Sequence, residues 1–485
     1  MSGMNALFNP ENIAIIGASN NPSKAGSVIV QNLLRKKYSK KIFPINPREV
    51  EIHGLKSYNK LSEIEDKIEL VVLITPSSMI YKIMEDLEKR MVEKNDVKAI
   101  VCAAADYGET KTEEGIRREN CLLDTAKKYG IRVVGPNCIG VIDNISKVDT
   151  TFVETGSTKE GSSIPGGISF ISQSGAIAST ILMVGDSSPV PIGFNKFISV
   201  GNMTDVDFID LLEYLEEDET TKVIGMYMEG YPKARKLINI MARTAKKKPI
   251  VVLKVGRSEK GASAANSHTG SLAGSDKVYD SAFKQYGIIR VETVEELLDT
   301  MKAFDRLPLP SDENLFILTQ AGGPGIYCTD AVSKHEDINM PVIKTETKEK
   351  LIQLLPSMAS VCSPEGYADI TAAATVKHHV DSLKLLLDDP NVSSVILIVI
   401  VPTFLPQIEL GEKLSEMYIN EGYINRKPVY FTIMAGDYVI PSRETMERKG
   451  IYTFEAPDRA VNSANNLIKY AKFKKNIKKE VDALD

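Results

Sequence analysis

The sequence lacks the features that mark nucleic-acid-binding, disulfide-rich and membrane proteins. Its 485 residues carry 59 basic and 64 acidic side chains, a net charge of −5, so no positive excess indicates a nucleic acid partner. The five cysteines form no CxxC pair, which argues against a disulfide framework or a zinc site. The N-terminus does not resemble a signal peptide, and the longest apolar runs are too short for a bilayer. We therefore expect a cytoplasmic protein without a membrane partner.

What the sequence does contain is short β-branched runs alternating with helical patterns, which is typical of parallel α/β sheets built from βαβ units. The length exceeds that of a single core, and we expect three domains: 1–150, 151–306 and 307–485. The first is a Rossmann-like unit. The expected strands are Ile13–Ile16, Ile42–Ile45, Leu70–Ile74, Ala99–Cys102, Ile131–Val134, Ile168–Ser172, Phe197–Val200, Val223–Met228, Ile250–Leu253, Leu315–Thr319, Val395–Val401 and Val429–Met434.

Two later segments, "ISFISQSGAIAS" and "LFILTQAGGPGIY", share one order: strand, Gln, small residue, Gly, helix. Such a turn directs backbone N–H groups and the positive end of the helix dipole at one spot. Each turn alone is equally well explained as an ordinary glycine βα turn, but the repetition favours anion binding. The predicted phosphate-binding residues are Ser172, Gln173, Ser174 and Gly175 in the first turn, and Gln320, Ala321, Gly322 and Gly323 in the second.

The first domain has a similar turn, Gly17-Ala18-Ser19, but without the G-x-G-x-x-G spacing. A nicotinamide site would place Asp or Glu at the end of the second strand, whereas this strand runs into Asn46-Pro47-Arg48. Arg48, together with Lys24, suits a phosphorylated ribose, which favours coenzyme A or NADP over NAD. "ITPSS", with Pro76, and "VVGPNCIG", with Asn137, follow two other strands, where ligands of such sheets bind.

The segment "SAANSHTGSLAGSD", Ser263 to Asp276, surrounds His268 with small residues. A stretch so poor in bulky apolar side chains is not expected to be packed core. We therefore expect the histidine to be presented to a ligand.

"GASNNPSKAG", "GPNCIG", "SQSGA", "MYMEG" and "SHTGSLAGSD", in this order, resemble the α subunit of ADP-forming acetyl-CoA synthetase. This family belongs to the NDP-forming acyl-CoA ligase superfamily, with succinyl-CoA synthetase. The resemblance covers essentially the whole chain. It implies a Rossmann-like CoA-binding domain followed by two flavodoxin-like ligase domains.

The resemblance also implies a reaction. Phosphate attacks an acyl-CoA thioester, the acyl phosphate phosphorylates His268, and the phosphohistidine passes its phosphoryl group to ADP. Glu229 would orient the imidazole, Asn137 would lie near the thioester, and the small residues would form a loop on which His268 moves. We assign no metal ligand in this chain. No ATP-grasp domain is found, which implies a separate β subunit that carries the nucleotide and Mg²⁺, in an α2β2 assembly.

Two segments depart from the family pattern: "CAAADYGET" after the fourth strand and "SPEGYADIT" in the third domain. Because of these two segments, the sequence does not decide whether the small carboxylic acid substrate is acetate or a longer, branched or hydroxylated acid. A non-catalytic CoA-binding regulatory or scaffold protein of the same fold is the alternative function. An NADP-linked oxidoreductase ranks last, because it gives no reason for two further domains with phosphate turns.

Overall fold

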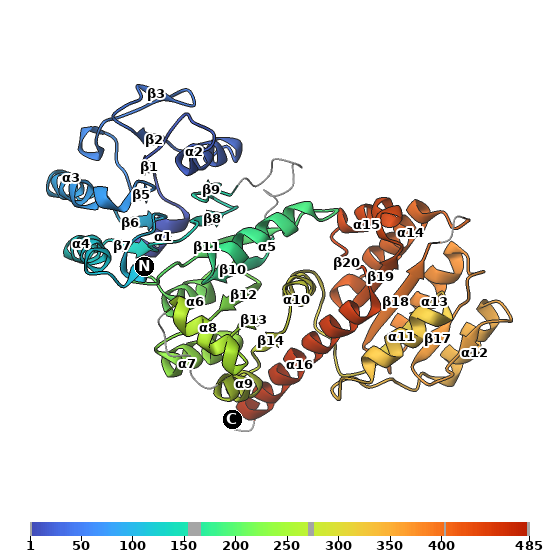
Figure 1. Cartoon of the computed structure of the whole chain (residues 1–485). Coiled ribbons are helices and arrows are strands. Elements are labelled where there is room, and N and C mark those ends of the chain that lie inside the picture. The colour runs from blue at the N-terminus through green and yellow to red at the C-terminus, as the bar shows by residue number, and fades with distance from the viewer. Residues whose placement is uncertain (1, 154–165, 270–275, 402–403, 483–485) are drawn as a thin grey trace. The chain divides into compact units, whose positions relative to one another are not determined.

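The computed structural model describes residues 2–153, 166–269, 276–401 and 404–482 (Figure 1). The chain divides into two compact units, Met1–Gln285 and Tyr286–Asp485. The sheets are largely parallel and flanked by helices, so the predicted α/β class is confirmed. Within the described ranges, no helix has the length and apolar character needed to cross a bilayer.

The first unit contains a five-stranded parallel sheet whose strands are buried, as β-branched runs of this kind require in parallel sheets. In spatial order its strands are β2 (Ile42–Ile45), β1 (Ile13–Ile16), β5 (Leu70–Leu73), β6 (Ala99–Cys102) and β7 (Arg132–Val134). Its helices are α1 (Ser2–Phe8), α2 (Ala25–Arg35), α3 (Ile80–Glu93) and α4 (Glu113–Tyr129). A small hairpin, β3 (Glu51–Ile52) and β4 (Leu55–Lys56), follows β2.

The same unit contains a second sheet. Its strands within this unit are, in spatial order, β13 (Ile250–Lys254), β12 (Val223–Met228), β10 (Ile168–Ser172), β11 (Phe194–Ser199), β8 (Val141–Asp143) and β9 (Val148–Asp149). The helices are α5 (Gly175–Ser187), α6 (Phe208–Glu217), α7 (Ala234–Ala245), α8 (Glu259–Thr269) and α9 (Asp276–Gln285). β8 pairs antiparallel with β11, although it lies inside the range 1–150 expected for the first domain. The predicted domain boundaries therefore stay predictions.

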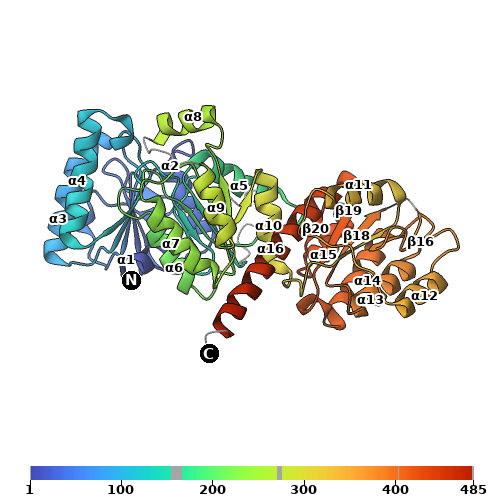
Figure 2. The ribbon, with the colours of Figure 1, turned by 90° about the horizontal axis from the view of Figure 1, so that it is seen from below.

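The second unit begins with β14 (Ile289–Val291) and α10 (Val294–Arg306) and contains a six-stranded sheet. Its strands, in spatial order, are β16 (Ser360–Val361), β17 (Tyr367–Asp369), β15 (Leu315–Thr319), β18 (Ser394–Ile400), β19 (Val429–Met434) and β20 (Thr453–Phe454). α11 (Gly322–Val332) and α13 (Val376–Asp388) lie on opposite sides of these strands (Figure 2). The other helices are α12 (Thr345–Leu354), α14 (Gln407–Asn420), α15 (Ile440–Glu447) and α16 (Pro457–Asp482).

Candidate active site

Three neighbouring strands of the second sheet end at one edge and carry the predicted catalytic region. β10 pairs with β12 in parallel register, Ser172 opposite Tyr227, and β12 pairs with β13, Met228 opposite Lys254. Parallel strands bring their carboxyl ends to the same edge. Gln173 and Glu229 are therefore adjacent. The sequence predicted that each follows a buried strand, and the pairing of β10 with β12 brings them together.

Gln173 is held by both its backbone and its side chain. Its backbone N–H donates to the Tyr227 carbonyl oxygen over 3.1 Å. Its Oε1 accepts from the backbone N–H of Glu229 at 2.8 Å and of Gly230 at 3.3 Å. The side-chain oxygen thus ties the turn after β10 to the turn after β12.

Glu229 is buried, with 7% of its surface exposed. Its backbone carbonyl accepts a 2.8 Å hydrogen bond from Nζ of Lys254, which is 1% exposed. Burial, followed by the charge of the Glu229 carboxylate and a hydrogen bond to it, raises the pKa of the Tyr227 hydroxyl to about 12. The phenol therefore stays protonated at neutral pH and can donate to the carboxylate.

The two predicted phosphate turns have the same internal hydrogen bonds. Ser172 Oγ donates to the Ser174 carbonyl over 2.7 Å, and Thr319 Oγ1 donates to the Ala321 carbonyl over 2.8 Å. Each hydroxyl also accepts from the backbone N–H of that second residue, at 3.2 Å in both turns. The N–H groups of Ser174 and Ala321 are therefore engaged within their own turns, and a ligand at either turn would have to use the N–H groups that follow at the start of α5 or α11.

In the second unit, the turn before α11 contains buried polar atoms. Gln320 is 1% exposed, and among the described residues neither its Oε1 nor its Nε2 has a hydrogen-bond partner. The same holds for the Thr371 hydroxyl, which follows β17 beside β15. A Cβ added at Gly323 would meet nothing within 4 Å. Unpaired buried polar groups are costly, so these atoms fit a site for a polar ligand.

His268 lies near the end of α8, and its side chain lies outside the described residues, as do Gly270 and Gly274. The expectation of a loop was wrong for Gly261–Ala265, because residues 259–269 are helical. Alanine has the highest helix propensity, and Ser258 caps the helix by accepting from the Gly261 N–H over 3.0 Å. Small residues here allow a helix as readily as a mobile loop.

The first turn of the chain depends on two glycines. Gly17 has a φ of +100°, and a Cβ there would lie 2.7 Å from the Ile74 carbonyl oxygen. A Cβ on Gly26 would lie 2.1 Å from the Gly17 carbonyl oxygen. Glycine is required at both positions, because the first turn of α2 packs directly on the turn after β1.

Three of the predicted CoA-binding residues lie around the half-buried carboxylate of Glu49. Glu49 Oε1 accepts from Ser19 Oγ at 3.1 Å and from Asn46 Nδ2 at 3.2 Å. Asn46 Nδ2 also donates to the Ala18 carbonyl over 2.8 Å. The structure thus brings Ala18, Ser19 and Asn46 together and leaves Lys24, Pro47 and Arg48 exposed. Sequence reasoning missed Glu49, although an acid four residues after the second strand is a usable signal.

Pro76 and Asn137 follow β5 and β7 at the same edge of the first sheet, and both are exposed. Asn137 has a φ of 58°, and its amide lies 3.4 Å from the Asn202 Oδ1. Asn202 in turn donates to Glu109 Oε2 over 2.6 Å. Asn202 therefore links "GPNCIG" to the segment that departs from the family pattern, a contact that no sequence signal indicated.

Cys138 is buried and its Sγ lies 3.4 Å from the Cys102 carbonyl. Burial raises the pKa of the Cys138 thiol well above its usual range. The thiol is protonated at neutral pH, so Cys138 acts as a packing residue and not as a nucleophile. In the part of the chain that the structure describes, no three His, Cys, Asp or Glu residues are grouped to hold a metal ion.

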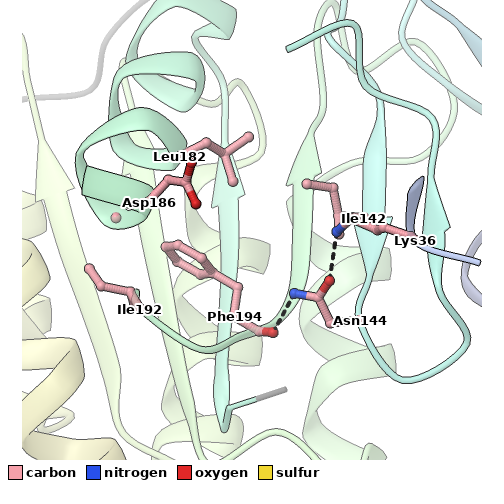
Figure 3. Close-up of a pocket in the computed structure, with 8 residues that line it drawn as sticks. Lys36, Ile142, Asn144, Leu182, Asp186, Ile192 and Phe194 are labelled. Carbon is pink, nitrogen blue, oxygen red and sulfur yellow. Dashed lines mark hydrogen bonds between the residues drawn. The ribbon is translucent and has the colours of Figure 1, made fainter. Parts of the chain in front are cut away.

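A cavity of about 10 Å³ lies beside α5, β8 and β11 (Figure 3). It holds about one water molecule and is too small for a substrate. At its edge Lys36 Nζ donates to Asn144 Oδ1 over 2.7 Å, and Asn144 Nδ2 donates to the Phe194 carbonyl over 2.8 Å (Figure 3). Lys36 also pairs with buried Asp149 at 3.3 Å, which connects the end of α2 to the second sheet.

Comparison with known proteins agrees with this arrangement. Residues 11–144 match the CoA binding domain family, and residues 165–304 match the succinyl-CoA ligase like flavodoxin domain. The fold and site therefore define a CoA ligase of the succinyl-CoA synthetase type. The chain is 38% identical to the acetate–CoA ligase [ADP-forming] II subunit alpha of Pyrococcus furiosus, over 96% of this chain and 97% of that protein. It belongs to the family of ADP-forming acetate–CoA ligase α subunits.

Two further proteins are similar over the full chain. The acetate–CoA ligase [ADP-forming] of Methanocaldococcus jannaschii is 36% identical, over 98% of this chain but 64% of that protein. The dinucleotide forming acetyl-coenzyme A synthetase 1 of Ca. Korarchaeum cryptofilum, solved in complex with phosphate and ADP, has a TM-score of 0.87 and 32% identity, and the match covers 99% of each chain. These matches confirm the predicted family.

Proposed function

We propose that this chain is the α subunit of an ADP-forming acyl-CoA synthetase that interconverts a carboxylic acid, ATP and CoA with acyl-CoA, ADP and phosphate. The observation that carries the proposal is the full-length match to an α subunit of this activity. The match to a CoA binding domain at residues 11–144 supports the same substrate.

Three steps connect acyl-CoA to ATP. A phosphate oxygen attacks the thioester carbonyl, and the CoA thiolate leaves. An imidazole nitrogen of His268 then attacks phosphorus, and the carboxylate of the acid leaves. Finally the β-phosphate of ADP attacks the phosphohistidine, which releases the imidazole. Neutral imidazole is a suitable nucleophile at physiological pH.

The residues that bind the phosphoryl group lie in the two similar turns. In the first, Ser172, Gln173, Ser174 and Gly175 precede or begin α5; in the second, Gln320, Ala321, Gly322 and Gly323 precede or begin α11. Glu229 orients the imidazole of His268. Within the described ranges the Nε2 of Gln320 has no hydrogen-bond partner, which supports a phosphate site in the second unit, since a phosphoryl oxygen would accept from this donor.

CoA binds the first domain through Gly17, Ala18, Ser19, Lys24, Asn46, Pro47, Arg48, Pro76 and Asn137. The exposed cations Lys24 and Arg48 suit the phosphates of CoA. The domains run from 1 to 150, from 151 to 306 and from 307 to 485.

The nucleotide, with Mg²⁺, is held mainly by a separate ATP-grasp β subunit in a cytoplasmic α2β2 complex. This chain matches an α subunit over 97% of its length but only 64% of the longer M. jannaschii enzyme. The remainder of that longer protein is where a fused partner would lie. The acid is acetate or a related small acid.

Intact-protein mass spectrometry at alkaline pH tests this function. The chain is incubated with its ATP-grasp partner, ATP and Mg²⁺, beside a His268→Ala control. We expect an added mass of about 80 Da that acid removes and that the control lacks. A wild-type chain that stays unphosphorylated while the partner is bound and active would favour the non-catalytic CoA-binding alternative.

A further inference from the structure

The two peptide groups on either side of the Glu229 Cα are each held by a side chain from a neighbouring strand. On the N-terminal side, the N–H of Glu229 donates to Gln173 Oε1 over 2.8 Å. On the C-terminal side, the carbonyl of Glu229 accepts from Lys254 Nζ over 2.8 Å. Gln173 follows β10 and Lys254 ends β13, and these two strands flank β12.

Lys254 is an unusual residue to hold the Glu229 carbonyl, because it is buried. Its side chain is almost completely buried, at 1% exposure, whereas lysine normally keeps its ammonium group in water. The ammonium also donates to the Val255 carbonyl and lies 5.4 Å from the centre of the Tyr279 ring. Burying a charge costs free energy unless the charged group is hydrogen-bonded. A buried lysine at this position therefore needs acceptors for its ammonium group, which a residue that only fills space does not.

The backbone after β12 contains a flexible residue next to Glu229. Glu229 is followed directly by Gly230, which restricts the chain least of all residues. The Tyr227 hydroxyl contacts the carboxylate itself, and the direction of the Glu229 side chain depends in addition on how firmly its two peptide groups are held. Gln173 and Lys254 supply these two contacts from opposite sides of β12.

We infer that Lys254 and the Gln173 side chain are positioning residues that aim the Glu229 carboxylate at the phosphorylated histidine. This inference rests on the proposed function of Glu229 and His268. It assigns Gln173 a second part beyond the phosphate turn: its Oε1 supports Glu229, which leaves only its Nε2 to donate to the phosphoryl group.

The chain offers a matched control for Lys254. Lys248 Nζ also donates to two backbone carbonyls, those of Leu215 at 2.6 Å and Asp218 at 2.5 Å. It precedes β13, whereas Lys254 ends that strand. A lysine-to-methionine change at either position removes the same kind of contacts, but only one of them belongs to Glu229.

The test measures the phosphorylation rate of His268 in the full complex by rapid quench and intact mass, with acetyl phosphate as the donor at varied concentration. We expect Lys254→Met to lower the saturating rate about 10-fold or more without changing the half-saturating concentration. Gln173→Met, which removes the support from the other side, should also lower the saturating rate, and because it removes the Nε2 donor to the phosphoryl group it should raise the half-saturating concentration as well. Lys248→Met should leave both parameters unchanged.

A double variant separates positioning from a general loss of structure. If Lys254 acts through Glu229, adding Lys254→Met to Glu229→Gln should slow the reaction no further. Equal slowing in both backgrounds, or no slowing by Lys254→Met or Gln173→Met, would overturn the inference. An unphosphorylated wild-type complex is a different result, because it removes the proposed function itself and this inference with it.

Discussion

The side-chain oxygen of Gln173 accepts a hydrogen bond from the backbone nitrogen of Glu229, 2.8 Å away. This contact joins the first phosphate turn to the residue proposed to orient His268. The same oxygen also accepts from the Gly230 N–H at 3.3 Å, so Gln173 holds the two turns together. The energetic and kinetic consequences of such contacts can be measured at several places in the chain.

Gln320→Met should raise stability and weaken phosphate binding. The change removes two buried amide atoms that lack partners in the described structure, a defect that costs about 1–3 kcal/mol. It also removes the proposed phosphate contact. Thermal unfolding with and without inorganic phosphate checks both effects: we expect a higher Tm without phosphate and a smaller rise on adding it. A lower Tm without phosphate would show that Gln320 contributes to packing.

Lys36→Met should destabilise the first unit by about 3–5 kcal/mol. The Lys36 and Asp149 side chains are 5% and 0% exposed, so the carboxylate would lose its ammonium partner away from water. Lys41→Met is the control, because the Lys41–Asp66 pair is 63% and 38% exposed and such pairs contribute about 0–1 kcal/mol. Urea unfolding measures both. Similar losses in the two variants would contradict the argument from burial.

His379 should make the second unit sensitive to acid. Burial lowers the pKa of its imidazole to about 4. The unfolded chain, with a pKa of about 6.5, therefore binds more protons than the folded chain between these values, and stability falls as pH drops through that window. The loss should total about 3 kcal/mol. His379→Leu should remove it, as thermal unfolding from about pH 7 to about pH 4 can show. An unchanged pH dependence would mean that other groups cause the acid sensitivity.

Gly26→Ala should weaken CoA binding, because the added Cβ would lie 2.1 Å from the Gly17 carbonyl oxygen. The turn after β1 must then move away from α2. Calorimetric titration with CoA measures the effect. Gly54→Ala serves as a comparison, since a Cβ there meets nothing within 4 Å although its φ is +80°. Equal affinity in wild type and Gly26→Ala would argue against a CoA site at this turn.

Much of the architecture could be predicted from local patterns. The strands Ile13–Ile16, Ala99–Cys102 and Val223–Met228 have the predicted bounds, because continuous β-branched runs between turn residues leave few alternatives. The prediction was less accurate for β11, which begins at Phe194, three residues before the predicted start. The polar Asn195 and Lys196 interrupt the apolar run in the sequence. Both are buried, because Asn195 donates to Asp218 and Lys196 pairs with Asp143.

The candidate site divides in the same way. The positions of Gln173 and Glu229 at strand ends follow from the sequence, since both come directly after apolar runs. The sequence does not predict that β8 pairs antiparallel with β11. Nor does it predict that Lys254 is buried and donates to the Glu229 carbonyl. A lysine at the end of an apolar strand has the pattern of a solvent-exposed residue, and only its neighbours show otherwise.

The sequence by itself determined the α/β class, the order of the elements and the family, because these depend on periodicity and on motifs within single segments. The tertiary structure alone decided which strands adjoin, which donors are already engaged and which polar atoms are buried. Those properties depend on contacts between residues far apart in the chain, such as Ser19 with Glu49 and Lys254 with Glu229. No local pattern encodes the free energy of such contacts, which is set by burial and geometry after the chain has folded.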